Sequence, residues 1–207
     1  MASTASPYGL RAVNELGGLP YAGSTRSFLI DPAGYNTNIY NGSIVTINTN
    51  GYLNIVTTNG DNSTPFPAGT IGIFVGCTYT NAQGQIIYSQ YYPANTASVQ
   101  GSAITAYVID DDRAVFQVQS AGTVAQAALG ANVYLNAVQS TSTGSTTTGN
   151  SNTAVVAGSS AATTSGYAFR VVGFANVPGF STVGDAYTDI LVKFNPGAHS
   201  YSNATGI

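Results

Sequence analysis

Residues 43–56 read Ser-Ile-Val-Thr-Ile-Asn-Thr-Asn-Gly-Tyr-Leu-Asn-Ile-Val. Asn50-Gly51 separates two segments that are rich in β-branched and aromatic side chains. Asn-Gly supplies the positive φ angles that a type I′ turn needs, so the stretch predicts a β-hairpin. This is the clearest local signal in the chain, and it sets the expectation of a β protein.

Strand signals continue on both sides of this hairpin. The further predicted strands are Ile71–Thr80, Gln85–Tyr92, Ala103–Ile109, Ala114–Gln119, Asn132–Val138, Tyr167–Phe174 and Tyr187–Phe194. One short helix is predicted over Val124–Leu129, with Thr123 as its N-cap and Gly130 closing its far end. About ten short strands with turn signals predict an all-β fold, an antiparallel β-sandwich or β-barrel with one short connecting helix and irregular N- and C-terminal segments.

The segments outside these strands indicate the domain organisation. A length of 207 residues suits one domain or at most two small ones. Residues 1–26, rich in Gly and Pro, predict an extended N-terminal arm, and residues 27–207 predict a single β-rich domain. Residues 139–152 contain no apolar side chain, so they predict a solvated loop or a long hairpin tip. The tail from Asn195 is expected to be irregular.

Charge and cysteine content exclude several classes of protein. Only 6% of the residues are charged, the formal net charge is −3, and the few basic residues are scattered, so no cationic face for nucleic acid is expected. The longest compact apolar run, Ile71–Cys77, is too short to span a bilayer, and the N-terminus lacks the basic and apolar regions of a secretory signal. A single cysteine excludes an internal disulfide framework and a thiolate metal cluster.

Candidate catalytic and metal-binding residues do not form a recognisable motif. His199, the single histidine, lies in a polar tail without a nucleophile motif, which predicts a surface or interface histidine rather than a general base. Cys77 has no basic neighbour in sequence and is expected to be a small buried side chain. Asp110-Asp111-Asp112 indicates either a calcium ligand set or a solvated turn, and the spacing, unlike that of an EF-hand loop, favours the turn. No cofactor is predicted.

The tyrosine content points to binding. The chain has 14 tyrosines and no tryptophan, and tyrosine is favoured at interfaces because it offers a large amphipathic contact area with little side-chain entropy to lose. Tyr88, Tyr91 and Tyr92, with Tyr79 upstream, predict either a binding surface or ordinary strand residues that cap the core. A nearly uncharged surface also repels its own copies weakly, which suits a protein bound in many copies and a carbohydrate-binding module equally well.

Several motifs, taken together, carry a resemblance to a known family. They are Ser6-Pro-Tyr-Gly-Leu10, Gly72-Ile-Phe-Val-Gly-Cys-Thr-Tyr-Thr80, Gln90-Tyr-Tyr-Pro-Ala94, Ala106-Tyr-Val-Ile-Asp-Asp111 leading to Phe116-Gln-Val-Gln119, Phe169-Arg-Val-Val-Gly-Phe174 and Asp185-Ala-Tyr-Thr-Asp-Ile-Leu-Val-Lys-Phe194. The set resembles small virion structural proteins of tailed phages that infect marine bacteria and cyanobacteria, namely head decoration, knob or cement proteins. The likeness extends over most of the chain, and its motifs carry no catalytic chemistry.

This resemblance implies a non-enzymatic protein, made in the host cytoplasm, that binds the outer surface of the assembled phage head and stabilises the shell. Its expected partner is the major capsid protein, with further copies of itself on the capsid lattice as a second candidate, and neither nucleic acid nor a membrane is expected. The residues expected to contact the capsid are Tyr8, Leu10, Arg11, Tyr21, Tyr88, Tyr91 and Tyr92. The alternative is a receptor- or glycan-binding β-module of a phage tail or fibre, and a hydrolase is the third and weakest interpretation.

Overall fold

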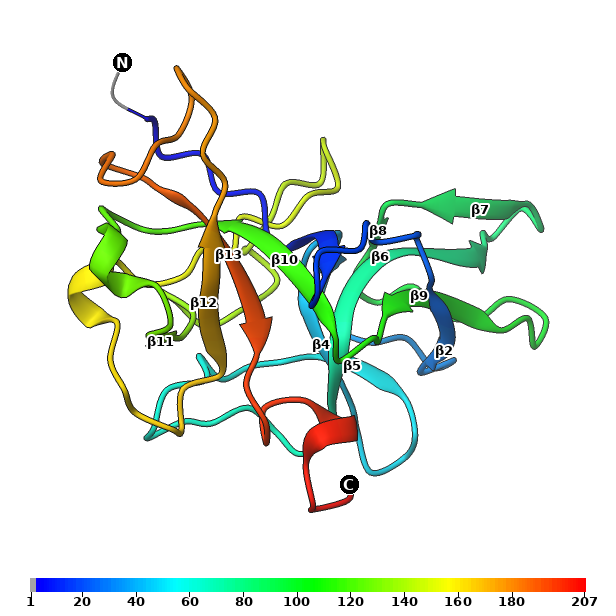
Figure 1. The fold of residues 1–207 in the computed structure, drawn as a ribbon. Helices are drawn as coiled ribbons and strands as arrows, with labels where there is room; N and C mark the ends of the chain where they lie inside the picture. Colours follow the sequence, from blue (N-terminus) through cyan, green and yellow to red (C-terminus); the bar gives the residue numbers. More distant parts are fainter. Residues whose placement is uncertain (1–2) are drawn as a thin grey trace.

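Two antiparallel sheets and one short strand pair organise residues 3–207, the part of the chain that the computed structural model describes (Figure 1). Sheet A contains, in spatial order, β1 (Arg11–Glu15), β10 (Ala114–Gln119), β13 (Asp189–Phe194), β12 (Phe169–Phe174) and β11 (Asn132–Val133). Sheet B contains β2 (Arg26–Ile30), β9 (Ile104–Ile109), β6 (Thr70–Thr80), β4 (Ile44–Ile47) and β5 (Leu53–Ile55), and β7 (Ile86–Ser89) pairs with β6. The short pair is β3 (Ile39–Tyr40) with β8 (Tyr91–Tyr92). The predicted all-β, antiparallel sandwich is confirmed, and the strands of residues 3–207 do not close into a barrel.

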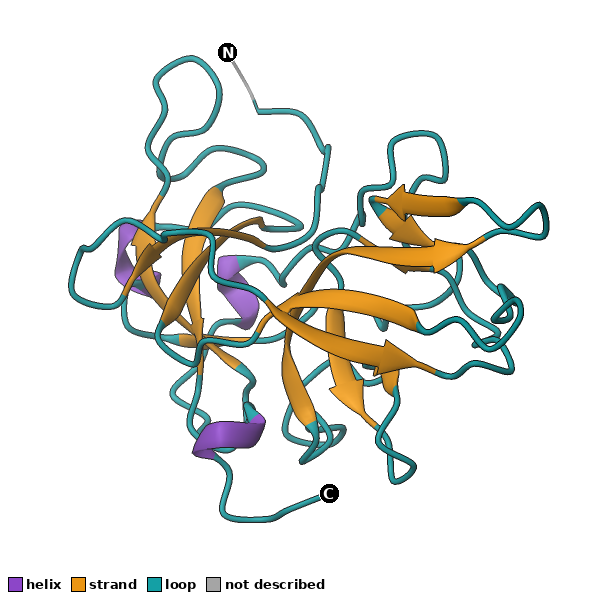
Figure 2. Ribbon diagram, turned by 90° about the vertical axis from the view of Figure 1, so that its right-hand side faces the viewer, coloured by secondary structure: helices purple, strands orange, loops and turns teal. Residues whose placement is uncertain are grey.

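The two sheets lie side by side and are joined where β9 passes into β10 (Figures 1 and 2). β9 pairs with β2 and β6, whereas β10 pairs with β1 and β13, so the turn at residues 110–113 carries the chain from one sheet to the other. β6 passes very close to the end of β9 at this turn. Gly72 has a φ of +146°, and a Cβ added there would lie 1.9 Å from the carbonyl oxygen of Ile109. Only glycine therefore allows β6 to pass at this distance.

The first hydrophobic cluster fills the space between the two sheets. Phe116, Phe169 and Phe194 come from sheet A, and Ile44 and Ile73 come from sheet B. The rings of Phe116 and Phe194 meet edge to face, with centroids 5.8 Å apart. This arrangement suits the ring quadrupoles, so the aromatic contacts stabilise the packing of the two sheets in addition to the apolar area they bury.

The second hydrophobic cluster lies on the opposite face of sheet B. Phe74 and Val108 are fully buried there, and the β3–β8 pair covers them with Ile39 and Tyr92. The hydroxyl of Tyr92 is satisfied inside the cluster, because it donates to the carbonyl of Thr96 at 2.7 Å. Sheet B is thus covered on both sides along part of its length, which explains the continuous apolar run at the start of β6.

The predicted hairpin at residues 43–56 is confirmed as β4 and β5, with a different turn type. Gly51 has a φ of +80°, but Asn50 does not adopt a positive φ, so the turn is not type I′. The amide of Gly51 donates to the carbonyl of Asn48 at 2.9 Å, and the Asn48 amide donates to the carbonyl of Tyr52 at 2.9 Å. The side-chain oxygen of Asn48 also accepts from the Asn50 amide. These bonds define a three-residue loop with a glycine bulge.

The predicted helix over Val124–Leu129 is wrong in length and capping. The structure has only a 3₁₀ helix, η1 (Gln126–Ala128), whose N-cap Ala125 makes no side-chain capping bond, so Thr123 is not the cap. Gly130 does follow it with a φ of +82°. Two other 3₁₀ helices are η2 (Gly158–Ser160) and η3 (Ser200–Ser202). No helix within residues 3–207 has the length and apolar character that crossing a membrane requires.

Three segments, predicted to be an extended arm, a solvated loop and an irregular tail, are packed in part against the sheets. Within the predicted N-terminal arm, Arg11–Glu15 is β1 and pairs with β10, so this segment is part of sheet A rather than a projecting arm. At the base of the loop at 139–152, buried Gln139 bonds the backbone of Ile44 and Val56, although the loop tip is exposed. In the tail, Asn195 is buried and η3 packs against β6.

Candidate functional site

An exposed sheet surface, which we call the open face, lies on sheet B where it extends beyond sheet A. The strand register aligns Leu29, Thr105, Thr78 and Tyr88 in one row across β2, β9, β6 and β7. Directly paired residues point to the same side of a sheet, and so do residues two apart on one strand. The open face therefore consists of Ser27, Leu29, Thr78, Thr80, Ile86, Tyr88, Thr105 and Tyr107.

The adjacent row on the same four strands points the other way. Phe28, Ala106, Cys77 and Ser89 are paired in this row, and the first three pack in or against the second hydrophobic cluster. The strands alternate between buried and open positions, most clearly in β9, where Ile104, Ala106 and Val108 are buried. This alternation fixes the open face in place, because a one-residue slip would expose the cluster.

The open face combines apolar side chains with hydroxyl groups. Tyr88, Ile86 and Leu29 are 78%, 65% and 49% exposed, which is high for side chains of this size. Between them, the hydroxyl oxygens of Thr78 and Tyr107 lie 3.1 Å apart and form a hydrogen bond across β6 and β9. The surface thus offers both apolar contact area and hydrogen-bonding groups, the combination found at protein interfaces.

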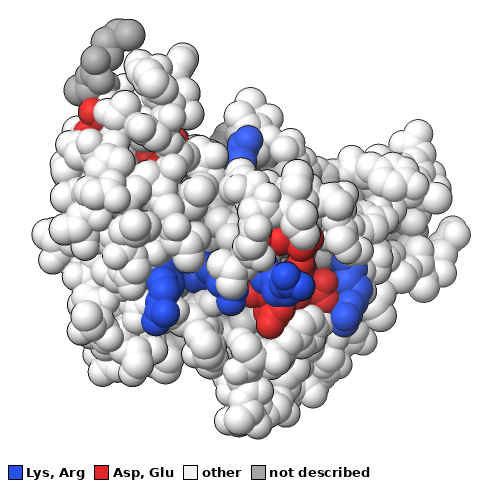
Figure 3. Space-filling view, viewed as in Figure 1, with Lys and Arg blue, Asp and Glu red and all other residues white. Residues whose placement is uncertain are grey.

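The open face is also free of charge. Residues 62–109, which include β6, β7 and β9, contain no Asp, Glu, Lys or Arg, and β2 contributes Ser27 and Leu29 to the face. On the face shown in Figure 3, the charged side chains form a band that extends from the left to right of the middle, and the far right-hand end carries none. A neutral partner surface would therefore meet no desolvated, unpaired charge here.

A groove of about 420 Å³ adjoins the open face at the junction of the two sheets. Val75 and Ile109 form its sheet B side, and Ile109 points to the same side of β9 as Tyr107. Arg11 and Tyr21 line the opposite side. On β9 the groove therefore lies two residues from Tyr107 of the open face, and polar side chains contribute much of its lining.

The predicted contact residues divide between this surface and the core. Tyr88 belongs to the open face, and Arg11 and Tyr21 belong to the groove. Leu10 and Tyr92 are 1% and 0% exposed, so the expectation that they contact a partner is wrong. Both are core residues, because Leu10 packs in the first cluster and Tyr92 in the second.

The two remaining predicted residues, Tyr8 and Tyr91, are partly buried and serve local packing. The ring of Tyr91 stacks on Tyr40 with centroids 5.7 Å apart. The guanidinium of Arg11 lies 5.2 Å from the centre of the Tyr8 ring, a cation–π contact. Burial, followed by the nearby carboxylate of Asp189, raises the pKa of the Tyr8 hydroxyl well above its usual value. Tyr8 is therefore held in place by sheet A and is not part of the open face.

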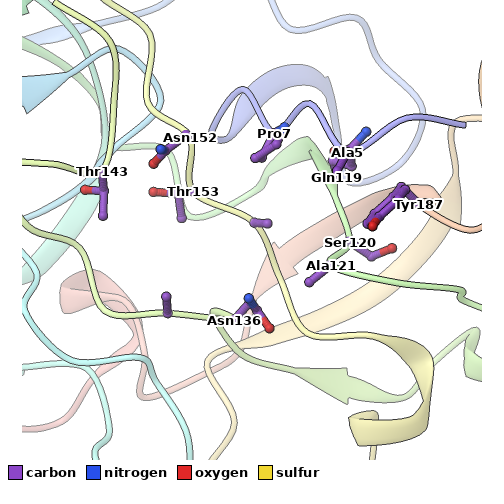
Figure 4. Close-up of a pocket in the computed structure, with 12 residues that line it drawn as sticks. Ala5, Pro7, Gln119, Ser120, Ala121, Asn136, Thr143, Asn152, Thr153 and Tyr187 are labelled. Atoms are coloured by element: carbon purple, nitrogen blue, oxygen red, sulfur yellow. The ribbon is translucent and has the colours of Figure 1, made fainter.

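A smaller cavity of about 200 Å³ lies between the N-terminal segment and residues 136–154 (Figure 4). Its lining combines Ala and Pro side chains with Asn, Thr, Ser and Gln. The carboxamide of Gln119 accepts from the Ser6 amide at 2.8 Å and donates to the Thr4 carbonyl at 3.1 Å. These bonds attach the N-terminal segment to β10, so Gln119 has a structural role at this cavity.

The titratable candidates are separated in the fold. His199, predicted to be a surface or interface histidine, is 1% exposed and packs against Phe194, so the predicted surface position is wrong. Burial lowers its pKa. Cys77 is buried as predicted, and burial raises the pKa of its thiol to about 12. Within residues 3–207, His, Cys, Asp and Glu side chains form no group of three or more that could hold a metal ion.

The acidic turn has a structural role that the sequence did not reveal. Asp110 forms an ion pair with Arg26 at 3.0 Å and accepts a hydrogen bond from the Tyr201 hydroxyl at 2.7 Å. The Arg26 guanidinium also donates to the Tyr201 hydroxyl at 2.7 Å. These contacts join β2, the β9–β10 turn and the tail, so the carboxylate of Asp110 is part of a latch for the tail.

The tyrosine content of the sequence does not predict most of the open-face residues. The useful signals are the charge-free run at residues 62–109 and the alternation of Ile104-Thr-Ala-Tyr-Val108, which places Thr105 and Tyr107 on one side of β9. Comparisons with protein-family models, with curated proteins and with solved structures found no match to this chain.

Proposed function

We propose that this chain is a non-enzymatic virion protein that binds the outer surface of an assembled phage capsid through its open face and stabilises the shell. The observation that carries the proposal is the uncharged, apolar and hydroxyl-bearing surface around Leu29 and Tyr88 on a firmly packed sheet. The sequence resemblance to head decoration proteins supplies the capsid as the partner. The groove with Arg11 and Tyr21 extends the contact area at one end.

The stabilisation that such a protein gives the shell adds up over many copies. A specific contact between two proteins needs roughly 800 Å² per partner, and an exposed sheet face with an adjoining groove supplies a surface of suitable character. When one protein contacts two neighbouring shell subunits, parting them also requires breaking its own contacts. Repetition over the lattice turns modest local energies into a large collective resistance.

The test mixes purified protein with undecorated heads and pellets the heads. Leu29→Lys combined with Thr105→Lys places two positive charges on the open face and leaves the second cluster intact. The matched control is Leu129→Lys, because Leu129 is 49% exposed, as is Leu29, but follows η1, far from the face in sequence. We expect the wild type and the control to pellet with heads and the double variant to lose at least tenfold in binding. Equal binding by all three would contradict the proposal.

The open face also favours a second candidate, a glycan-binding module. The exposed ring of Tyr88 offers an apolar surface for a sugar, and Thr78, Thr105 and Tyr107 offer hydroxyls beside it. Pelleting with host cell envelopes in place of heads separates the two candidates. Sedimentation with envelopes and not with heads would replace the capsid proposal by this one.

A further inference from the structure

β7 is an edge strand whose free side has a defined hydrogen-bonding pattern. Within residues 3–207 it pairs with β6 alone, in the register Thr80↔Ile86, Tyr79↔Ile87 and Thr78↔Tyr88. The Asn81 amide donates to the Gln85 carbonyl at 2.9 Å, so Asn81 and Gln85 form a hydrogen-bonded pair at the end of the ladder.

Hydrogen-bonded and non-hydrogen-bonded pairs alternate along an antiparallel ladder. The alternation starts at the hydrogen-bonded pair Asn81–Gln85. The N–H and C=O groups of Ile87 therefore point toward β6, whereas those of Ile86 and Tyr88 point away from it. Within residues 3–207, neither Ile86 nor Tyr88 makes a backbone hydrogen bond outside the ladder. The free edge therefore presents the N–H and C=O groups of the same two residues whose side chains are most exposed on the open face.

We infer that this edge pairs with β7 of a second copy of the chain, antiparallel, about a twofold axis at Ile87. In this register Ile86 of one copy lies opposite Tyr88 of the other, and each such pair exchanges N–H···O=C bonds in both directions. The two Ile87 residues form the central non-hydrogen-bonded pair. An aromatic ring opposite a β-branched side chain is a favourable cross-strand pair, and the twofold axis repeats it.

The absence of charge on this edge favours a second copy as the occupant. A twofold axis places identical surfaces together, so any charge on the edge would meet a like charge nearby. Residues 62–109 carry none, and β7 also lacks the Lys and Pro residues that usually protect an edge strand from pairing. The surface is therefore compatible with its own copy, without an electrostatic penalty.

The pairing has a geometric consequence for the whole molecule. An axis normal to the sheet keeps both open faces on the same side, so two copies present one continuous, doubled face. If the proposed function holds, such a dimer contacts two positions on the shell at once. The edge itself is only four residues long, so we expect an association that is weak and concentration-dependent in free solution.

The first test is sedimentation velocity of the free protein. We expect the mass to rise with concentration from 21.1 kDa toward twice that value. Ile86→Lys combined with Tyr88→Lys should keep the protein at the monomer mass, because both side chains are exposed and the variant retains its core. The control Leu129→Lys should associate like the wild type. A wild type that stays monomeric up to about 1 mM, or a double variant that associates like the wild type, would overturn the inference.

The second test is the register. Ile87→Cys places two thiols at the twofold axis, where side chains of a non-hydrogen-bonded pair lie close enough for a disulfide after small adjustments. Mild oxidation should give a covalent dimer, while Leu129→Cys, treated in parallel, should remain monomeric. Native Cys77 is buried in both variants and does not interfere. Equal cross-linking of the two variants would reject the pairing at β7. Because neither experiment contains capsids, its outcome is independent of the proposed function.

Discussion

Phe28, Ala106 and Cys77 lie in one row across β2, β9 and β6, and Leu29, Thr105 and Thr78 lie in the next row on the opposite side of the sheet. The first row packs in or against the second cluster, and the second row lies on the open face. Alternate residues of the same strands thus form two faces: a dry face, which packs in or against the second cluster, and the exposed open face.

The difference between the two faces separates stability from binding. Side chains on the dry face lose their contact with water when the protein folds, so their removal lowers the free energy of unfolding. Side chains on the open face remain in water and contribute little to folding, but they are available to a partner. The following experiments change one face at a time.

The largest effect is expected from a charge on the dry face. Ala106→Lys buries an unpaired ammonium group at a position that is 0% exposed, which should lower the free energy of unfolding by more than about 3 kcal/mol. The neighbouring substitution Thr105→Lys places the same charge on the open face and should cost less than about 1 kcal/mol. Urea unfolding of both variants provides the measurement. Similar losses in the two would show that the faces are not distinct.

A cavity in the second cluster should have the next largest effect. Phe74 is fully buried in β6, and Phe74→Ala should lower the free energy of unfolding by about 3–5 kcal/mol. Leu29→Ala on the open face should change it by less than about 0.5 kcal/mol. Chemical denaturation monitored by circular dichroism measures both. A loss of under about 1 kcal/mol for Phe74→Ala would mean that this cluster is not a packed core.

His199 should make stability depend on pH. Burial lowers its pKa in the folded state, against a smaller opposing contribution from the Ile71 carbonyl and from Asp112 and Asp110, with Lys193 acting in the same direction as burial. The unfolded chain therefore takes up the proton first as the pH falls. The contribution of the neutral imidazole is complete above about pH 6.5 and decreases below it.

The measurement is the melting temperature of the wild type and of His199→Gln at pH 7.5 and pH 5.5. Other groups also titrate, for example Asp189, whose pKa is raised by burial. These groups are present in both the wild type and the variant, so their contribution cancels when the two are compared. We expect the wild type to lose more stability than the variant on acidification. Parallel losses would show that His199 is not the group responsible.

The smallest effect is expected at the tail latch. Tyr201→Phe removes the hydroxyl that accepts from Arg26 and donates to Asp110, and should lower the free energy of unfolding by about 0.5–1.5 kcal/mol. The Arg26 side chain is 60% exposed, so added salt should reduce the difference between variant and wild type. A difference unaffected by salt would indicate that packing of the ring, and not the ionic contact, holds the tail.

Local signals in the sequence predicted local structure well. The Asn-Gly turn located β4 and β5, since a hairpin depends on neighbouring residues, and Cys77 was correctly placed in the interior. The turn type was wrong because the side chain of Asn48 stabilises a different loop. The other structural features depend on tertiary contacts between residues far apart in the sequence.

Residue type alone could not separate Tyr88 from Tyr92, because Tyr88 lies on an open edge strand, whereas Tyr92 lies beside β3 with its side chain in the second cluster. His199 is buried because the tail folds back onto β6, and Leu10 is buried because sheet A and sheet B meet there. In the same way, no pattern near residues 110–113 indicates that β9 and β10 belong to different sheets. Predicting the open face requires the register of four paired strands, and the amino-acid sequence alone does not give that register.

An electron-microscopy map of the intact particle tests the proposed binding of the open face to the shell most directly. We expect density for this protein on the outside of the head, with the face formed by β2, β9, β6 and β7 turned toward the shell. Density confined to the tail, or a protein on the head whose Leu29 and Tyr88 face solvent, would contradict it.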